Sequence, residues 1–158
     1  MRQLKIVSGG QTGVDQGALD AALDAGYECG GWCPQGRLSE AGPIPRRFPV
    51  RELEGAGYRE RTFRNVIDSD GTAIVHFGEL EGGTRETADY CRGNGRPHVV
   101  IDRSTSSFSE ALSALTVFVE AHDIRVLNVA GPRQSKWSGA HESARELIGA
   151  LLSSLVQA

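Results

Sequence analysis

Three short apolar runs of the sequence each end at a glycine-containing turn that leads into a segment with helical spacing. The runs cover residues 4–8, 72–77 and 125–130, and the turns contain Gly9, Gly82 and Gly131. Two more apolar runs, at residues 27–32 and 97–102, alternate with helical segments in the same way. Alternation of strands and helices predicts a mainly parallel sheet with helices on both faces. We therefore expect a doubly wound, Rossmann-like α/β fold.

The predicted helices lie between these strands. Apolar residues recur at helical spacing over residues 15–25, 58–67, 84–91, 107–122 and 138–156. The remaining long stretch, residues 35–57, contains four glycines and three prolines and follows neither period. We expect it to be a long loop or excursion, and long loops in compact domains are often functional. The whole chain, residues 1–158, is predicted to be a single Rossmann-like ligand-binding domain.

The bulk composition is typical of a globular protein of the cytoplasm. Of the 158 residues, 39% are hydrophobic and 23% are charged, and the net charge is −3. This charge excludes a global attraction for nucleic acid or for an anionic membrane. No apolar stretch reaches the ~20 residues that a membrane span needs, and the first residues lack the apolar region of a signal peptide. We expect a cytoplasmic protein that binds neither nucleic acid nor membranes.

The three cysteines do not predict a disulfide framework, because their number is odd. Cys29 and Cys33 have a C-x3-C spacing, which is weak evidence for a metal or redox site. We interpret Cys29, Cys33 and Cys91 as reduced, partly buried thiols. A ligand or redox role stays open as the alternative.

Arginine dominates the basic residues, since 15 of the 17 are Arg. Seven of them lie within residues 37–64. A guanidinium group presents a planar fork that matches two oxygens of a phosphate or carboxylate. Codon usage alone would also enrich arginine, but the clustering favours a small anion as the partner.

The three glycine turns should lie at one edge of a parallel sheet. Ligands of open α/β sheets bind beyond the carboxyl ends of the strands. Glycine lets backbone N–H groups approach a ligand without an intervening Cβ, and the following helix adds its unpaired amides and positive dipole end. Thr12 and Thr84 add hydroxyl groups, and Arg133 adds a charged fork. One such turn is more often only a tight strand-to-helix connection, but three at one edge predict an oxyanion site.

The first of these turns, residues 9–13, reads G-G-x-x-G. It is not the dinucleotide fingerprint G-x-G-x-x-G. It is not a phosphate-binding Walker A loop either, because no Gly-Lys-Ser/Thr follows it. The turn therefore predicts a backbone-lined anion site without naming the ligand.

Other polar side chains divide by their place along the predicted elements. Asp15 lies at the start of the first helix, and we interpret it as a structural helix cap. Arg61 and Thr62 lie in the first turns of the 58–67 helix, which should face the ligand edge. Asp68 and Asp70 then lie at the opposite edge, as turn residues.

The histidines do not predict a metal site. His76 lies within a strand, where a core or sheet-surface position is expected. His98, His122 and His141 share no spacing with another metal-ligand residue. We find no Ser-His-Asp or zinc constellation in the sequence.

The chain resembles the molybdenum cofactor carrier family in the stretches GGQTGVDQGALDAAL, GGWCPQGR, YRERTFRNVIDSDGT, GGTRET and LNVAGPR. The stretches follow in order over nearly the whole chain. The family looks like part of a wider Rossmann-like superfamily that includes the cytokinin-activating phosphoribohydrolases and nucleotide-ligand sensors. The resemblance implies a homo-oligomer that binds the molybdopterin form of the cofactor, protects it and hands it to an acceptor molybdoenzyme.

The resemblance also implies cofactor-binding roles for residues in these stretches. They are Gly9, Gly10, Gln11, Thr12, Gly13, Pro34, Gly36, Arg37, Arg61, Thr62, Gly82, Gly83, Thr84 and Arg133. The terminal phosphate of molybdopterin suits a glycine loop at a helix N-terminus. Its flat pterin would stack on Trp32 or Tyr58, although core packing is the better explanation of Trp32.

The hydrolases of the superfamily use the pattern G-G-x-G-T-x-x-E, in which the glutamate serves hydrolysis of an N-glycosidic bond. Here Thr87 stands three residues after Thr84, and Glu86 is one place short. One helical step turns a side chain by about 100°. Hydrolysis is therefore disfavoured unless Glu86 is re-aimed.

We expect a binding protein for a phosphate-bearing small cofactor, the molybdenum cofactor above all, rather than an enzyme. Two alternatives stay open. One is a phosphoribohydrolase-like enzyme that acts on nucleoside monophosphates through Glu86. The other is a sensor that binds ADP-ribose or a similar nucleotide and signals to a partner.

Overall fold

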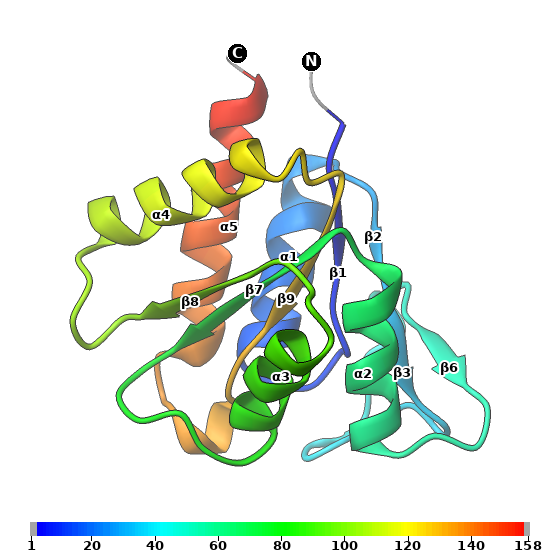
Figure 1. The fold of residues 1–158 in the computed structure, drawn as a ribbon. Helices are drawn as coiled ribbons and strands as arrows, with labels where there is room; N and C mark the ends of the chain where they lie inside the picture. Colours follow the sequence, from blue (N-terminus) through cyan, green and yellow to red (C-terminus); the bar gives the residue numbers. More distant parts are fainter. Residues whose placement is uncertain (1–2, 157–158) are drawn as a thin grey trace.

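The computed structural model describes residues 3–156. Its main sheet has five strands in the order β2-β1-β9-β7-β8, and every neighbouring pair is parallel (Figure 1). The strands are β1 (Lys5–Val7), β2 (Cys29–Gly30), β7 (Gly71–His76), β8 (His98–Asp102) and β9 (Val126–Ala130).

Helices cover both faces of this sheet. They are α1 (Val14–Ala25), α2 (Tyr58–Asp68), α3 (Gly82–Gly93), α4 (Phe108–Ala121) and α5 (Ala140–Val156). Helices α1, α4 and α5 lie on one face, and α2 and α3 lie on the other (Figure 1). The expected doubly wound, Rossmann-like α/β class is confirmed. The helices begin and end close to the predicted residues because their apolar faces pack on the sheet.

The main core lies between the sheet and the layer of α1, α4 and α5. It is built from aliphatic side chains such as Val75, Leu127, Leu115 and Leu147. Strand β7 is buried along its whole length, as expected for a strand covered on both faces. Helices α1 and α5 approach closely at Gly17, where an added Cβ would overlap the His141 carbonyl oxygen.

The run at residues 27–32, expected as one strand, forms parts of two sheets. Gly31 separates β2 from β3 (Trp32–Pro34) with a φ of 121°, and a Cβ there would overlap the backbone of Ser8. The chain therefore bends after β2 and leaves the main sheet. Strand β3 pairs in parallel with β6 (Arg51–Leu53) instead.

Residues 35–57 form an ordered excursion from the main sheet, which is one of the two forms expected for this stretch. They contain the short antiparallel pair of β4 (Leu38–Ser39) and β5 (Gly42–Pro43), as well as β6. A second small core forms here from Ile44, Phe48 and Val50, which pack with Leu19 and Cys33. These apolar residues follow no strand or helix period, so periodicity did not reveal them.

The topology brings three strand ends together. The chain leaves β1 through α1 toward β2 on one side, and it leaves β7 through α3 toward β8 on the other. Strand β9 lies between β1 and β7. Such a reversal of direction opens a crevice beyond the carboxyl ends of the central strands. Among residues 3–156, no helix has the length and apolar character needed to cross a membrane.

Candidate functional site

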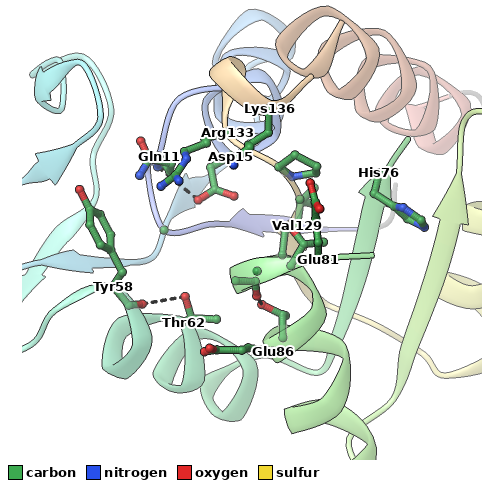
Figure 2. A pocket seen from close by; sticks show the side chains of 18 of the residues that line it. Gln11, Asp15, Tyr58, Thr62, His76, Glu81, Glu86, Val129, Arg133 and Lys136 are labelled. Atoms are coloured by element: carbon green, nitrogen blue, oxygen red, sulfur yellow. Dashed lines mark hydrogen bonds between the residues drawn. The ribbon is translucent and has the colours of Figure 1, made fainter. Parts of the chain in front are cut away.

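A pocket of about 530 Å³ occupies this crevice. All three glycine turns reach it, since Gly9, Gly82 and Gly131 belong to its lining. Figure 2 shows Asp15 and Arg133 on one side, Thr62 of α2 and Glu86 of α3 on the other. Segments that are far apart in the sequence thus meet at one edge of the sheet.

Eight of the fourteen residues expected at the site line this pocket. They are Gly9, Gln11, Arg61, Thr62, Gly82, Gly83, Thr84 and Arg133. Tyr58 lines the pocket as well, whereas Trp32 does not. The convergence of these residues is a feature of the fold, and their binding roles stay predictions.

The first turn is shaped around Arg61. The Arg61 guanidinium lies so close to Gly9 that a Cβ on Gly9 would overlap it. Arg61 is only 9% exposed, and its Nη1 lies 3.5 Å from Asp15 Oδ2. Its Nε is buried and has no hydrogen-bond partner within residues 3–156. Helix α2 therefore places a cation over the turn and leaves part of its donor capacity unused.

Asp15 is a pocket residue as well as part of the first helical turn. Asp15 is 4% exposed, and the N–H of Gln11 donates to its Oδ2 at 3.2 Å. Burial raises the pKa of Asp15 to about 6, although the Arg61 charge and the N–H groups of Gln11 and Gly9 act in the opposite direction. The carboxyl group is thus poised to change its charge near neutral pH.

Gln11 links the first glycine turn to the excursion formed by residues 35–57. Its Oε1 accepts hydrogen bonds from the N–H of Thr12 at 3.0 Å and from the N–H of Glu40 at 2.9 Å. The Glu40 carboxylate in turn accepts from the N–H of Ser135 at 3.3 Å. The segment of β4 and β5 is therefore tied to both the first and the last glycine turn.

The second turn presents the start of α3 to the pocket. Gly82 has a φ of 54°, which favours glycine, and no atom lies within 4 Å of a Cβ added at Gly82 or Gly83. The N-cap residue Glu81 makes no side-chain capping bond. The first amides of α3 thus have no cap from the Glu81 side chain, and they lie at the positive end of the helix dipole.

The third turn adds cations. A Cβ at Gly131 would overlap the Val75 carbonyl oxygen, so glycine is required for the turn to pass over β7. Arg133 and Lys136 follow it, line the pocket and are exposed. Neither forms an ion pair with any side chain in the described part of the chain.

Three expected residues of the first turn shape it without lining the pocket. Gly10 and Gly13 have φ values of 78° and 82°, which glycine adopts readily. Thr12 Oγ1 accepts from the N–H of Gln134 at 3.2 Å, so its hydroxyl ties two turns together. These residues are structural parts of the turn.

The expected residues of the WCPQGR stretch also lie outside the pocket. Arg37 donates to the carbonyl oxygens of Ile44, Pro45, Phe48 and Val50, at distances from 2.9 to 3.2 Å. Its guanidinium is thereby occupied in holding the excursion together.

Pro34 ends β3, and the N–H of Gly36 donates to Glu52 Oε1 at 2.6 Å. Trp32 donates from Nε1 to Asp68 at 2.9 Å and lies beneath the guanidinium groups of Arg51 and Arg64. Trp32 therefore packs against the surface of α2 and away from the ligand edge.

One end of the pocket was not predicted from the sequence. His76 is the last residue of β7, Phe77 and Glu79 follow that strand, and Lys136 and Trp137 follow the third turn; all five line the pocket. The sequence predicts a core or sheet-surface position for His76, and the structure buries it at the end of β7, in the wall of the pocket.

The acidic turn residues lie where they were expected. Asp70 Oδ2 accepts from the N–H groups of Arg125 and Val126 at 3.0 and 2.8 Å, and Asp68 pairs with Arg64. Neither belongs to the pocket lining. Over residues 3–156, no group of three or more His, Cys, Asp or Glu side chains could hold a metal ion. Burial raises the pKa of the Cys29, Cys33 and Cys91 thiols.

The fold and the crevice define a Rossmann-like α/β protein with a ligand pocket at its topological switch point. Residues 6–152 match the circularly permutated YpsA SLOG family, and the chain therefore belongs to that family. It is also similar to a crystal structure from Syntrophus aciditrophicus SB of a protein described as "putative molybdenum carrier protein". The two share 38% identity over 95% of each chain, with a TM-score of 0.92. The expected resemblance is thereby confirmed. No curated protein matches the chain.

Proposed function

We propose that this protein binds a phosphate-bearing cofactor and that this cargo is the molybdopterin form of the molybdenum cofactor, which the protein stores, protects and transfers. The observation that carries the proposal is the convergence of three glycine turns and their cations on one pocket. The similarity to the Syntrophus protein supports the choice of cofactor.

The residues in the pocket fit such a ligand. The uncapped amides at the start of α3 and the exposed cations Arg133 and Lys136, which form no ion pair within residues 3–156, suit an oxyanion. A volume of about 530 Å³ lies within the range of pockets that enclose small molecules.

Protection would follow from enclosure. Walls from α2, α3 and the third turn surround the pocket on several sides, so a bound ring would be shielded from water and dissolved oxygen. Transfer requires that the cargo also leaves. Association into homo-oligomers and hand-over to an acceptor molybdoenzyme are further parts of the proposal.

The test is protection of released cofactor from oxidation. Cofactor set free from a molybdoenzyme is mixed with the purified protein in air, and the surviving cofactor is followed by its ability to reconstitute an apo-molybdoenzyme. We expect a clearly longer lifetime with the wild type and its loss with Arg133→Ala. Arg46→Ala is the matched control, because Arg46 is exposed and lies outside the pocket lining. Equal lifetimes with and without protein would refute the proposal.

One observation favours a second candidate, an enzyme acting on nucleoside monophosphates. Glu86 lines the pocket, and its carboxylate lies 3.6 Å from Nε of Arg59. An acid or base at this place would reach a bound ligand, which is a condition for general acid–base catalysis. Chromatography of reactions with AMP decides the matter. Free base and ribose 5-phosphate that disappear with Glu86→Gln would favour the enzyme.

A further inference from the structure

Positive and negative side chains line the pocket in equal number. Two cations are paired with carboxylates there, Arg59 with Glu86 at 3.6 Å and Arg61 with Asp15 at 3.5 Å. Four further charged residues of the lining remain without an ion pair in residues 3–156: Arg133 and Lys136 after β9, and Glu79 and Glu81 after β7. A pocket built only for a polyanion would gain nothing from free carboxylates. The free carboxylates therefore indicate a ligand that also offers hydrogen-bond donors.

The end of the pocket beyond β7 is aromatic. Phe77 is 54% exposed, and its ring lies 5.6 Å from the Trp137 ring, measured between centroids. Both residues belong to the lining. An exposed aromatic side chain in a pocket wall suits a flat heterocycle, because aromatic rings stack favourably on any base.

We propose that the end of the pocket formed by Phe77 and Trp137 binds the flat ring of the ligand. Glu79 and Glu81 accept hydrogen bonds from the N–H edge of that ring. The site then prefers rings that contain a 2-amino-4-oxopyrimidine unit, as pterin and guanine do, over adenine. This inference rests on the proposed function, because the phosphate group is held by the cationic end of the same pocket.

The preference follows from the donor pattern of the rings. A 2-amino-4-oxo ring presents a ring N–H and an adjacent amino group, two donors that face a carboxylate together. Adenine presents an unprotonated ring nitrogen at the corresponding edge. Ionised carboxylates only accept hydrogen bonds, so adenine would leave a carboxylate facing a lone pair. Specificity of this kind combines attraction for one ring with repulsion of the other.

Calorimetric titration of the full chain with GMP and AMP tests the preference, because the two ligands share ribose 5-phosphate and differ only in the ring. We expect GMP to bind at least about tenfold tighter, as a charged hydrogen bond allows. The double variant Glu79→Gln, Glu81→Gln should abolish this ratio. The control Glu120→Gln, Glu146→Gln removes the same charge from exposed positions outside the pocket and should keep it. Equal affinity for GMP and AMP, or no binding of either, would overturn the inference.

Fluorescence of Trp137 tests the place of the ring. The chain has two tryptophans, so Trp32→Phe leaves Trp137 alone. GMP should change its emission, whereas ribose 5-phosphate should not. Phe77→Ala, at an exposed position, should weaken GMP about fivefold or more and leave ribose 5-phosphate unaffected.

Failure of the ring-site inference can be distinguished from failure of the proposed function. Ribose 5-phosphate that binds as tightly as GMP and competes with it would overturn the ring site and leave the anion-binding function standing. Lack of cofactor protection together with a clear GMP preference would refute the proposed cargo and leave the ring site standing.

Discussion

The guanidinium of Arg61 rests on the backbone of Gly9, in space that any side chain at position 9 would fill. This contact joins helix α2 to the first glycine turn, and it brings Arg61 within 3.5 Å of Asp15. The absence of a side chain at Gly9 therefore positions a cation, in addition to freeing the backbone for a ligand.

Gly9→Ala should displace Arg61 and weaken binding of phosphate-bearing ligands at least about tenfold, or about 1.4 kcal/mol. The far end of an arginine side chain can move, so we expect the free energy of unfolding to fall by only about 1 kcal/mol. Titration calorimetry and urea unfolding measure the two effects. Gly149→Ala, in a helix with open space around it, should leave ligand affinity unchanged.

A double-mutant cycle tests whether Gly9→Ala lowers ligand affinity by displacing Arg61. In an Arg61→Ala background, Gly9→Ala should add almost nothing to the loss of affinity, because the group it displaces is gone. Additive losses would show that Gly9 acts through its own backbone and would contradict the role of the contact.

Asp15 should make stability depend on pH. Burial raises its pKa from 3.8 to about 6 in the folded protein. The folded state then binds more protons than the unfolded state between these values, so its stability decreases as pH rises. Between pH 5 and pH 8 the wild type should lose about 1.4 kcal/mol relative to Asp15→Asn. Urea unfolding at several pH values measures the difference, and a pH-independent difference would disprove the assignment.

Two aspartates on α1 offer a matched comparison. Asp20 is 14% exposed and accepts from His141 at 2.8 Å and from Arg47 at 3.2 Å, whereas Asp24 pairs with Arg145 on the surface. Burial opposes ionisation of Asp20, but the bonds from Arg47 and His141 outweigh it and lower its pKa. Its contribution is therefore present above the ordinary pKa and lost as pH falls through the lowered value.

Asp20→Asn should cost about 1–2 kcal/mol of unfolding free energy at neutral pH, since it weakens charged hydrogen bonds between α1 and its neighbours. Asp24→Asn should cost clearly less, because exposed pairs contribute little. Thermal or urea unfolding of both variants measures the two losses of unfolding free energy. Equal losses would mean that the Asp20 network adds nothing beyond a surface pair.

Arg37→Ala should destabilise the excursion without touching the pocket. Removal of the guanidinium leaves four carbonyl groups near residues 44–50 without their donor, and we expect a loss of at least about 2 kcal/mol. Hydrogen exchange of residues 38–53 should accelerate. Affinity for the ligand should stay within about twofold. A large loss of ligand affinity at an unchanged free energy of unfolding would show that Arg37 takes part in ligand binding.

The sheet and its helices were predictable because their signals are local. The alternation of apolar runs and helical segments, together with the rule for parallel sheets, was enough to bring Gly9, Gly82 and Gly131 to one edge. The split between β2 and β3 was not predictable, since Gly31 acts through its contact with the distant Ser8 backbone.

Residues of the site were predictable only where a rule about the backbone applied, as it does for glycine turns that follow parallel strands. Arg37 and Arg133 have the same side chain, and the sequence offered no way to tell that one holds carbonyl groups while the other faces a pocket. His76 and Trp137 were missed for a related reason. Whether a residue at a strand end or after a turn lines a cavity depends on packing between distant elements.

The central claim is that three glycine turns form one oxyanion pocket, and a crystal structure of the protein grown with the molybdenum cofactor tests it most directly. The account predicts the terminal phosphate within hydrogen-bond distance of Arg133 and of the first amides of α3. A phosphate bound anywhere else on the protein, with the three turns left in contact with solvent alone, would contradict it.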